Sequence, residues 1–135
     1  SPFAAVFILA LVLIVQGVLF GDGGITTMGT NIINMGVIGG FVGFYSFRGL
    51  MGVTKSMPVS VFLAAWLSCL IPARAASIEM YLAGTFPLVE GMIAMGIYHA
   101  IIGVIEGFVT VAAIYLITTA RPDLVDTGVK TVAGA

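Results

Sequence analysis

Few residues of this chain could take part in chemistry, and two of them fall on one face of a single apolar segment. His99 and Glu106 are seven residues apart, nearly two helical turns, which places both side chains on one side of a helix about 10 Å apart. Charges at membrane depth cost roughly 2.5 to 3.5 kcal/mol, so each carries a functional hypothesis. The pair is typical of a polar seam that lines a metal path, relays protons or docks a partner. It is equally typical of hydrogen bonds that only fix helix packing.

Small residues accompany this pair. Gly103 and Gly107 form a G-x-x-x-G motif beside Glu106, and Thr110 continues the same stripe. Small residues let two membrane helices approach closely, so we expect this face to pack against a neighbouring helix. The segment 30–47 carries two overlapping motifs of the same kind, at positions 36/40 and 39/43, and we expect close packing there as well.

The other charged residues of the apolar segments have simpler interpretations. Arg74 and Glu79 are five residues apart and therefore on different faces of a helix. We expect both to reach the headgroup region along their own side chains, without a partner. Glu90 follows Pro87 closely, and a carboxylate in a first helical turn complements the positive helix end.

Sulfur residues and enzyme motifs give no further site. Seven methionines suggest a soft-metal path for Cu(I), but scattered methionine in membrane helices is more often adaptable packing material, the interpretation adopted here. Cys69 is the only cysteine, which excludes an intrachain disulfide, and we interpret it as a small buried hydrophobe. The chain has no phosphate-binding loop, H-E-x-x-H, G-x-S-x-G or C-x-x-C motif. We therefore predict that it is not an enzyme.

The composition of the chain predicts the membrane helices that must position His99, Glu106 and the other polar residues. Of the 135 residues, 60% are hydrophobic and 8% are charged, against roughly 25% charged in soluble domains. Crossing about 30 Å of hydrocarbon takes about 20 apolar residues. The sequence therefore predicts an all-α polytopic membrane bundle, a single membrane domain over residues 1–135 with about four transmembrane helices. These are expected at about 3–20, 30–47, 58–82 and 88–119.

Helix-breaking residues separate the four segments. Glycines surround Asp22, Pro58 suits a first helical turn, Pro87 follows the third segment, and Pro122 follows the fourth. The fourth segment would be nearly 50 Å long, so we expect it to tilt, protrude or bend, with Gly96 as the bending point. The net charge of -1 offers no basic field for nucleic acid.

The distribution of Lys and Arg predicts an orientation. With four crossings, both ends of the chain share one side of the membrane, and the expected positions of four basic residues lie there too: Arg48, Lys55, Arg121 and Lys130. The opposite side holds the Asp22 loop and at most Arg74. Because cytoplasmic loops carry the excess of Lys and Arg, we expect a multi-pass protein of the cell membrane with both ends of this chain in the cytoplasm.

Two stretches resemble a known family. They are LFGDGGITTMGTNIINMGVIGGF at 19–41 and GIYHAIIGVIEGFVTVAAIYL at 96–116, the latter followed by RPDL at 121–124. Together they resemble the CbiM/NikM family, the substrate-binding membrane subunits of energy-coupling-factor cobalt and nickel importers. The match covers nearly the whole chain in the family's order.

The resemblance implies a function and a set of partners. The subunit would capture Co(II) or Ni(II) for ATP-driven import, supplying metal for cobalamin biosynthesis or metalloenzymes. Its partners would be a CbiQ-type transmembrane coupling subunit, a pair of ATPase subunits and often a small accessory membrane subunit. ATP would be hydrolysed by those ATPase subunits, in agreement with the missing phosphate-binding loop.

The resemblance also implies that the family's metal ligands lie outside this chain. They are nitrogen ligands from an N-terminal Met-His segment and from another histidine, both upstream of Ser1, so we predict no metal ligand here and expect the chain to be the C-terminal part of a longer subunit. Four residues match the family motif and are expected to support the metal site from behind: Asn31, Met35, His99 and Glu106. Two departures from the family are Asp22, where many relatives have His, and Gly40, where many have Pro.

Two other hypotheses remain open at the level of sequence. The first is a stand-alone four-helix membrane scaffold or assembly protein, with G-x-x-x-G faces that bind neighbours and no substrate of its own. The second is a proton-coupled carrier that uses His99 and Glu106.

Overall fold

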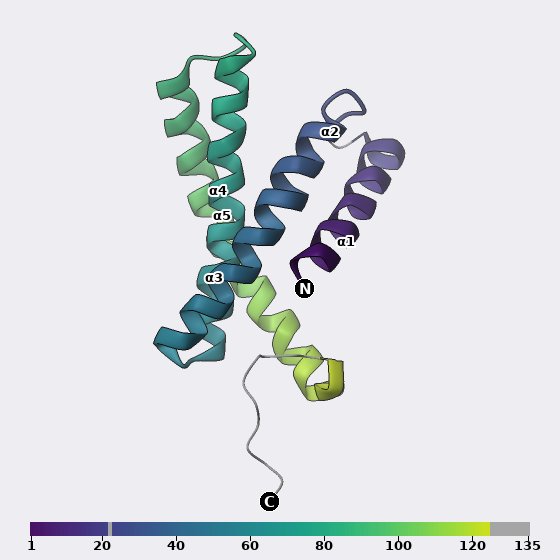
Figure 1. Cartoon of the computed structure of the whole chain (residues 1–135), viewed down its shortest axis with the longest axis vertical. Coiled ribbons are helices and arrows are strands. Elements are labelled where there is room, and N and C mark those ends of the chain that lie inside the picture. Colours follow the sequence, from purple (N-terminus) through teal and green to yellow (C-terminus); the bar gives the residue numbers. More distant parts are fainter. Residues whose placement is uncertain (22, 125–135) are drawn as a thin grey trace, which may run out of the picture.

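The chain folds into four long apolar helices, each long enough to cross a membrane (Figure 1). This computed structural model describes residues 1–21 and 23–124, so the predictions that concern Asp22 and Lys130 lie outside the described residues. The prediction of an all-α membrane bundle is confirmed. The elements in chain order are α1 (Pro2–Val15), η1 (Gln16–Phe20), α2 (Met28–Asn31), η2 (Ile32–Ile38), α3 (Gly39–Thr54), α4 (Met57–Leu82), α5 (Leu88–Ala120) and η3 (Pro122–Leu124).

Two of the spans are composite. The first joins α1 to the π-helical η1 and ends at Gly21, whose φ of 69° is the left-handed conformation that glycine adopts without a steric penalty. The second joins α2, the π-helical η2 and α3 over 28–54. A π-helix is rare and frequently marks a functional region, and η2 is the part of this span that contains Asn34 and Met35.

The second span is longer than the expected 30–47. It continues past Arg48 to Thr54, and Lys55 then takes a left-handed φ of 53°. The Thr54 hydroxyl accepts a hydrogen bond from the Ser56 backbone N–H at 3.2 Å and lies 2.7 Å from the Ser60 hydroxyl. A turn of only two residues therefore connects α3 to α4.

Helices α4 and α5 form a long antiparallel hairpin, α3 packs along α4, and α1 packs on η2 and α3. The hairpin is tight at the glycines of α5. A Cβ at Gly103 would lie 2.9 Å from Cδ1 of Trp66, and the Trp66 indole N–H donates to the carbonyl of Ala100 at 2.9 Å. A Cβ at Gly107 would lie 2.6 Å from Cδ2 of Phe62. The glycines thus make room for aromatic rings from α4.

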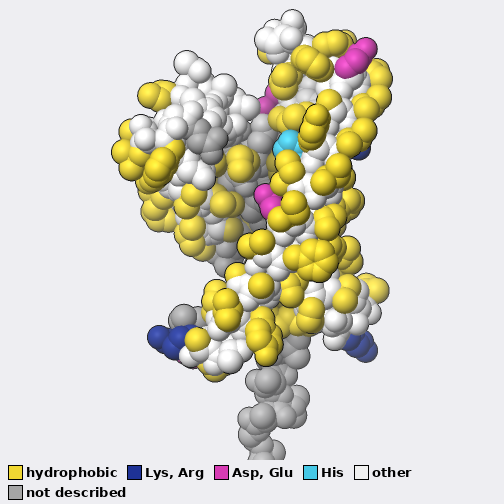
Figure 2. Space-filling model, turned by 180° about the vertical axis from the view of Figure 1, so that it is seen from behind, with side chains coloured by type: hydrophobic (Ala, Val, Ile, Leu, Met, Phe, Trp, Pro, Cys, Tyr) yellow, Lys and Arg dark blue, Asp and Glu magenta, His cyan; other side chains and the backbone are white. Residues whose placement is uncertain are grey.

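Large hydrophobic side chains face outward on every span. Examples are Phe7 at 66% exposure, Tyr45 at 60%, Tyr81 at 52% and Phe108 at 65%, and Figure 2 shows hydrophobic side chains over most of the visible helical surface. Exposed apolar area on this scale is unfavourable in water and favourable against lipid chains. The helix interfaces are built instead from small residues, as is usual in membrane bundles.

Candidate functional site

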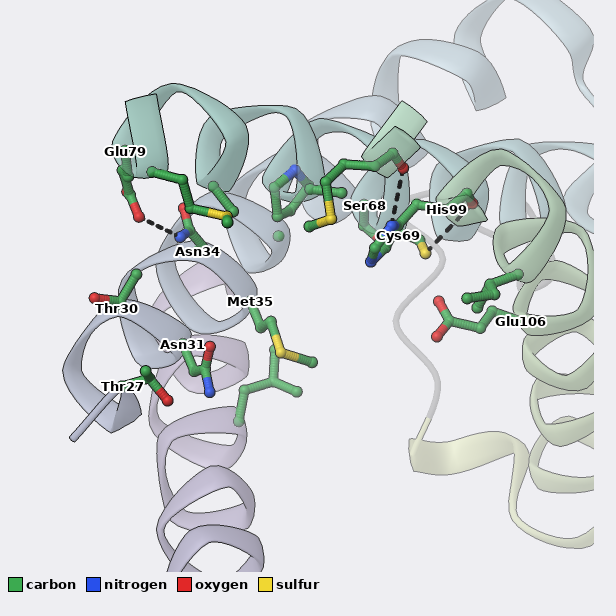
Figure 3. Close-up of a pocket in the computed structure, with 18 of the residues that line it drawn as sticks. Thr27, Thr30, Asn31, Asn34, Met35, Ser68, Cys69, Glu79, His99 and Glu106 are labelled. Atoms are coloured by element: carbon green, nitrogen blue, oxygen red, sulfur yellow. Dashed lines mark hydrogen bonds between the residues drawn. The ribbon is translucent and has the colours of Figure 1, made fainter. Parts of the chain in front are cut away.

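A cavity of about 720 Å³ lies between the second span and the α4–α5 hairpin (Figure 3). Its wall on one side comes from α2 and η2, and on the other from the faces of α4 and α5 that are turned toward them. Six residues give it most of its polar or soft character: Asn31, Asn34, Met35, Glu79, His99 and Glu106.

The structure brings four of the residues predicted from sequence into this one cavity. Asn31 and Met35 line it from the second span, and His99 and Glu106 line it from α5. Gly103 and Gly107 lie on another face of α5, against Trp66 and Phe62 of α4, and do not line the cavity. The support of a metal site by Asn31, Met35, His99 and Glu106 remains a prediction.

Glu79 belongs to the cavity although sequence reasoning did not place it there. Its Oε2 accepts a hydrogen bond from Nδ2 of Asn34 at 2.7 Å, so the expectation that Glu79 needs no partner is wrong. Asn34 is only 4% exposed, and its Oδ1 has no hydrogen-bond partner among the described residues. The hydrogen bond from the amide orients the carboxylate.

Arg74 points away from this cavity. Its side chain is exposed on α4, and its guanidinium rests on the α5 backbone, where a Cβ at Gly96 would lie 2.6 Å from Nη2. Gly96 therefore accommodates a side chain from the neighbouring helix. Helix α5 is continuous through that position.

His99 has a defined tautomer when its ring is neutral. Its Nδ1 lies 2.9 Å from the carbonyl oxygen of Met95, and because a carbonyl can only accept, Nδ1 must carry the hydrogen. The lone pair is then on Nε2. This is the arrangement seen in many metal-binding histidines, in which one ring nitrogen is held by a backbone carbonyl and the other is left free.

Sulfur atoms add soft character to the same wall. Met35, Met80 and Met95 all line the cavity, as does Cys69, whose thiol donates to the carbonyl of His99 at 3.7 Å. The sequence offered no local signal for this grouping, since the three methionines come from three different helices.

The electrostatic character of the cavity favours cations. Two carboxylates line it, and no Lys or Arg is among its lining residues. In a membrane interior, where charge is weakly screened, an uncompensated negative group attracts a cation strongly. Within the described residues, however, no three His, Cys, Asp or Glu side chains come close enough to hold a metal ion. The cavity is thus suited to receive a cation and does not contain a complete chelating site.

Comparison with known proteins finds one family. A family model described as CbiM, cobalt uptake substrate-specific transmembrane region, matches residues 1–124. The chain is 35% identical over 93% of its length to an Archaeoglobus fulgidus protein named as a fused nickel transport protein, NikMN. It is 31% identical over 92% of its length to the cobalt transport protein CbiM of Geobacter sulfurreducens, and 39% identical over 70% to that of Clostridium tetani.

The match covers only part of these relatives. The chain spans 43% of the Archaeoglobus protein, 38% of the Geobacter protein and 37% of the Clostridium protein. No solved structure matches the chain.

Proposed function

We infer that this chain, which belongs to the CbiM family of cobalt-uptake transmembrane regions, is part of the substrate-capture membrane subunit of an importer for Co(II) or Ni(II). The observation that carries this proposal is the cavity, which Glu79, His99 and Glu106 line and to which no Lys or Arg contributes. Imidazole and carboxylate groups suit divalent first-row ions of this kind. The metal would be the substrate of the subunit and not a resident cofactor.

The partners proposed for this subunit follow from its family. They are a CbiQ-type transmembrane coupling subunit, a pair of ATPase subunits and a small accessory membrane subunit. The exposed apolar helices offer surface to other membrane segments. In this proposal the ATPase subunits hydrolyse ATP.

The proposed location is the cell membrane, with both ends of this chain in the cytoplasm. Three basic residues support this orientation: Arg48 near the end of α3, Lys55 in the turn after it, and Arg121 directly after α5. Since α3 and α5 run in the same direction across the bundle, all three lie at the same end, and positively charged ends favour the cytoplasmic side.

The function is tested with the full-length protein assembled with its coupling and ATPase subunits in proteoliposomes. We expect ATP-dependent accumulation of radioactive Co(II) or Ni(II). Replacing Ala76, which lines the cavity, by Lys would place a cation there, and we expect the initial rate to fall about tenfold or more by charge repulsion.

The matched control is Ala76→Met, which adds similar bulk without charge and should retain most of the uptake. Equal losses in the two variants would mean that occupied volume matters and charge does not. If the assembled wild-type protein accumulates neither ion, the importer function is contradicted, and a scaffold without a substrate becomes the better description.

A further inference from the structure

We propose that Arg74 forms an ion pair with an Asp or Glu side chain on another membrane helix of the same subunit, one that lies outside residues 1–135. This inference concerns how the subunit is assembled and does not depend on which substrate it carries. The face involved is the side of the α4–α5 hairpin that is turned away from the cavity, since Arg74 is not among the residues that line the cavity.

Gly96 fixes the position of the Arg74 side chain. A Cβ at Gly96 would lie 2.6 Å from Nη2, 2.8 Å from Nε and 2.9 Å from Cζ of Arg74. These nearly equal distances place the flat face of the guanidinium over the α5 backbone. The N–H donors of a guanidinium lie in its plane, so the contact with Gly96 uses none of them.

This contact lies inside the apolar layer. Arg74 is eight residues before Leu82, the last residue of α4, and Gly96 is eight residues after Leu88, the first residue of α5. At about 1.5 Å per residue, each lies about 12 Å from the end of its helix. The 26 residues of α4 extend over about 39 Å. Equal overhangs on a core of about 30 Å would leave the guanidinium roughly 7 Å inside the hydrocarbon.

The direction of the side chain keeps the charge at that depth. Side chains on a helix lean toward its N-terminus, and α4 begins at the membrane surface that is farther from Arg74. The guanidinium therefore packs sideways onto Gly96 and does not extend toward the nearer headgroups, as a snorkelling arginine would.

The described part of the chain supplies no counter-charge. Within residues 1–21 and 23–124 the one ion pair joins Arg121 to Asp123, and Glu79 is bonded to Asn34 on the cavity side. Charged residues at membrane depth are costly and almost always pair with another group. A carboxylate can accept two parallel N–H bonds from a guanidinium. The acceptor that suits this position is therefore Asp or Glu.

The apolar surroundings indicate that a helix carries this carboxylate. On α4, Ile71 and Ile78 are exposed on the same side as Arg74, and on α5, Ile93 and Ile97 are exposed next to the contact. A membrane helix packed on the hairpin would cover these isoleucines and bring an acidic side chain to the guanidinium in a region with little water. In such a region the attraction between the two charges is weakly screened.

The length of the relatives favours a helix of the same subunit. The chain spans 38% of the Geobacter CbiM protein and 37% of the Clostridium one, so members of this family have further length from which such a helix can come. A coupling subunit is the competing source of a carboxylate. The two sources differ in whether the subunit purified alone depends on Arg74.

The test measures the unfolding temperature of the full-length subunit, purified alone in detergent micelles. Arg74→Met keeps the length of the side chain and removes its charge. Because the substitution would leave the paired carboxylate uncompensated, we expect the unfolding temperature to fall by about 5 to 10 °C. If Arg74 had no partner, removing its charge from the apolar layer would leave the temperature unchanged or raise it.

A second substitution identifies the partner. In the Arg74→Met background, each Asp and Glu of the remaining membrane spans is replaced in turn by Asn or Gln, and neutralising the partner should restore most of the lost temperature. The matched control is Arg121→Gln, at an exposed arginine directly after α5 that pairs with Asp123. Exposed ion pairs contribute little, so we expect a shift below about 2 °C.

Three results would overturn the proposed pair: an unfolding temperature of Arg74→Met at or above that of the wild type, an equal loss in Arg121→Gln, and a scan in which no substitution restores stability. A loss that appears only after the coupling subunit is added would place the carboxylate on that subunit and would also contradict a pair within one subunit. Failure of the import function would appear separately, as absence of Co(II) and Ni(II) uptake by the wild-type assembly.

Discussion

Asn34 and Glu79 show how one hydrogen bond can orient a carboxylate in a cavity wall. The amide N–H of Asn34 is 2.7 Å from a carboxylate oxygen of Glu79, a short, charge-assisted contact between the second span and α4. It fixes the orientation of the carboxylate and joins two helices that are far apart in the sequence. Stability and ion attraction at this point therefore depend on the same pair of residues.

This pair gives a prediction for Asn34→Asp. The substitution replaces the N–H donor by a second carboxylate oxygen against Glu79, and we expect the free energy of unfolding to fall by about 2 to 3 kcal/mol because the two acceptors repel each other. Thermal unfolding of the purified protein in detergent micelles at neutral pH measures the change. Asn34→Ala removes the donor without adding a charge and should lose less. Equal stability of Asn34→Asp and the wild type would show that the hydrogen bond contributes little.

Sequence reasoning identified part of this site and missed part of it. His99 and Glu106 were found because charged residues in an apolar segment are conspicuous, and Asn31 and Met35 because of their position in a family motif. The partnership of Asn34 with Glu79 was missed because the two residues are forty-five positions apart. No local spacing rule predicts how two helices align along their shared contact.

At the scale of elements, the π-helical η2 decides which side chains reach the cavity. It contains both Asn34 and Met35, and its wider turn rotates later residues relative to a regular α-helix. Counting 3.6 residues per turn through this span would therefore assign some residues to the wrong face. The other cavity wall comes from regular helices, and there the predicted shared face of His99 and Glu106 agrees with their common position in the lining.

The glycines of α5 give a prediction for helix packing. A Cβ at Gly103 would lie 2.9 Å from Cδ1 of Trp66, and that ring is fixed by its hydrogen bond to Ala100. We expect Gly103→Ala to destabilise the hairpin by about 1 to 3 kcal/mol, measured as a lower unfolding temperature in detergent.

The matched control for this substitution is Gly49→Ala. Gly49 is in α3, and nothing lies within 4 Å of its Cβ position, so alanine there should be neutral or stabilising by up to about 1 kcal/mol. Similar behaviour of the two variants would contradict the packing role of Gly103.

The helices themselves were largely predictable, and their ends less so. Long apolar runs with few charges indicate membrane spans because the lipid core requires them. The sequence predicts an end of the second span at residue 47, directly before Arg48, whereas the helix continues until Lys55 adopts a left-handed backbone. A single arginine does not break a helix, and the geometry of the connecting turn cannot be read from hydropathy.

At the scale of the whole molecule, the basic residues give a prediction about orientation. In a full-length protein with Cys69→Ala, a cysteine at Lys55 and one at Thr85 would lie at opposite ends of α4 and its adjoining turns. We expect a membrane-impermeant maleimide to label Thr85→Cys in intact cells and Lys55→Cys only after the membrane is permeabilised, because Lys and Arg favour the cytoplasmic side. The reverse labelling pattern would invert the orientation proposed for this chain.

The short connection between α3 and α4 has a mechanical consequence. Lys55 and Ser56 join the two helices at the end opposite Thr27 and Thr85, which line the cavity, and Figure 1 shows the two halves of the bundle spreading apart above that region. When two helices are joined at one end, a rotation at the connection displaces their residues by an amount that grows with distance from it. A small rotation at Lys55 would therefore alter the spacing near Glu79 more than the spacing near Glu106, and the Asn34–Glu79 hydrogen bond opposes that spreading.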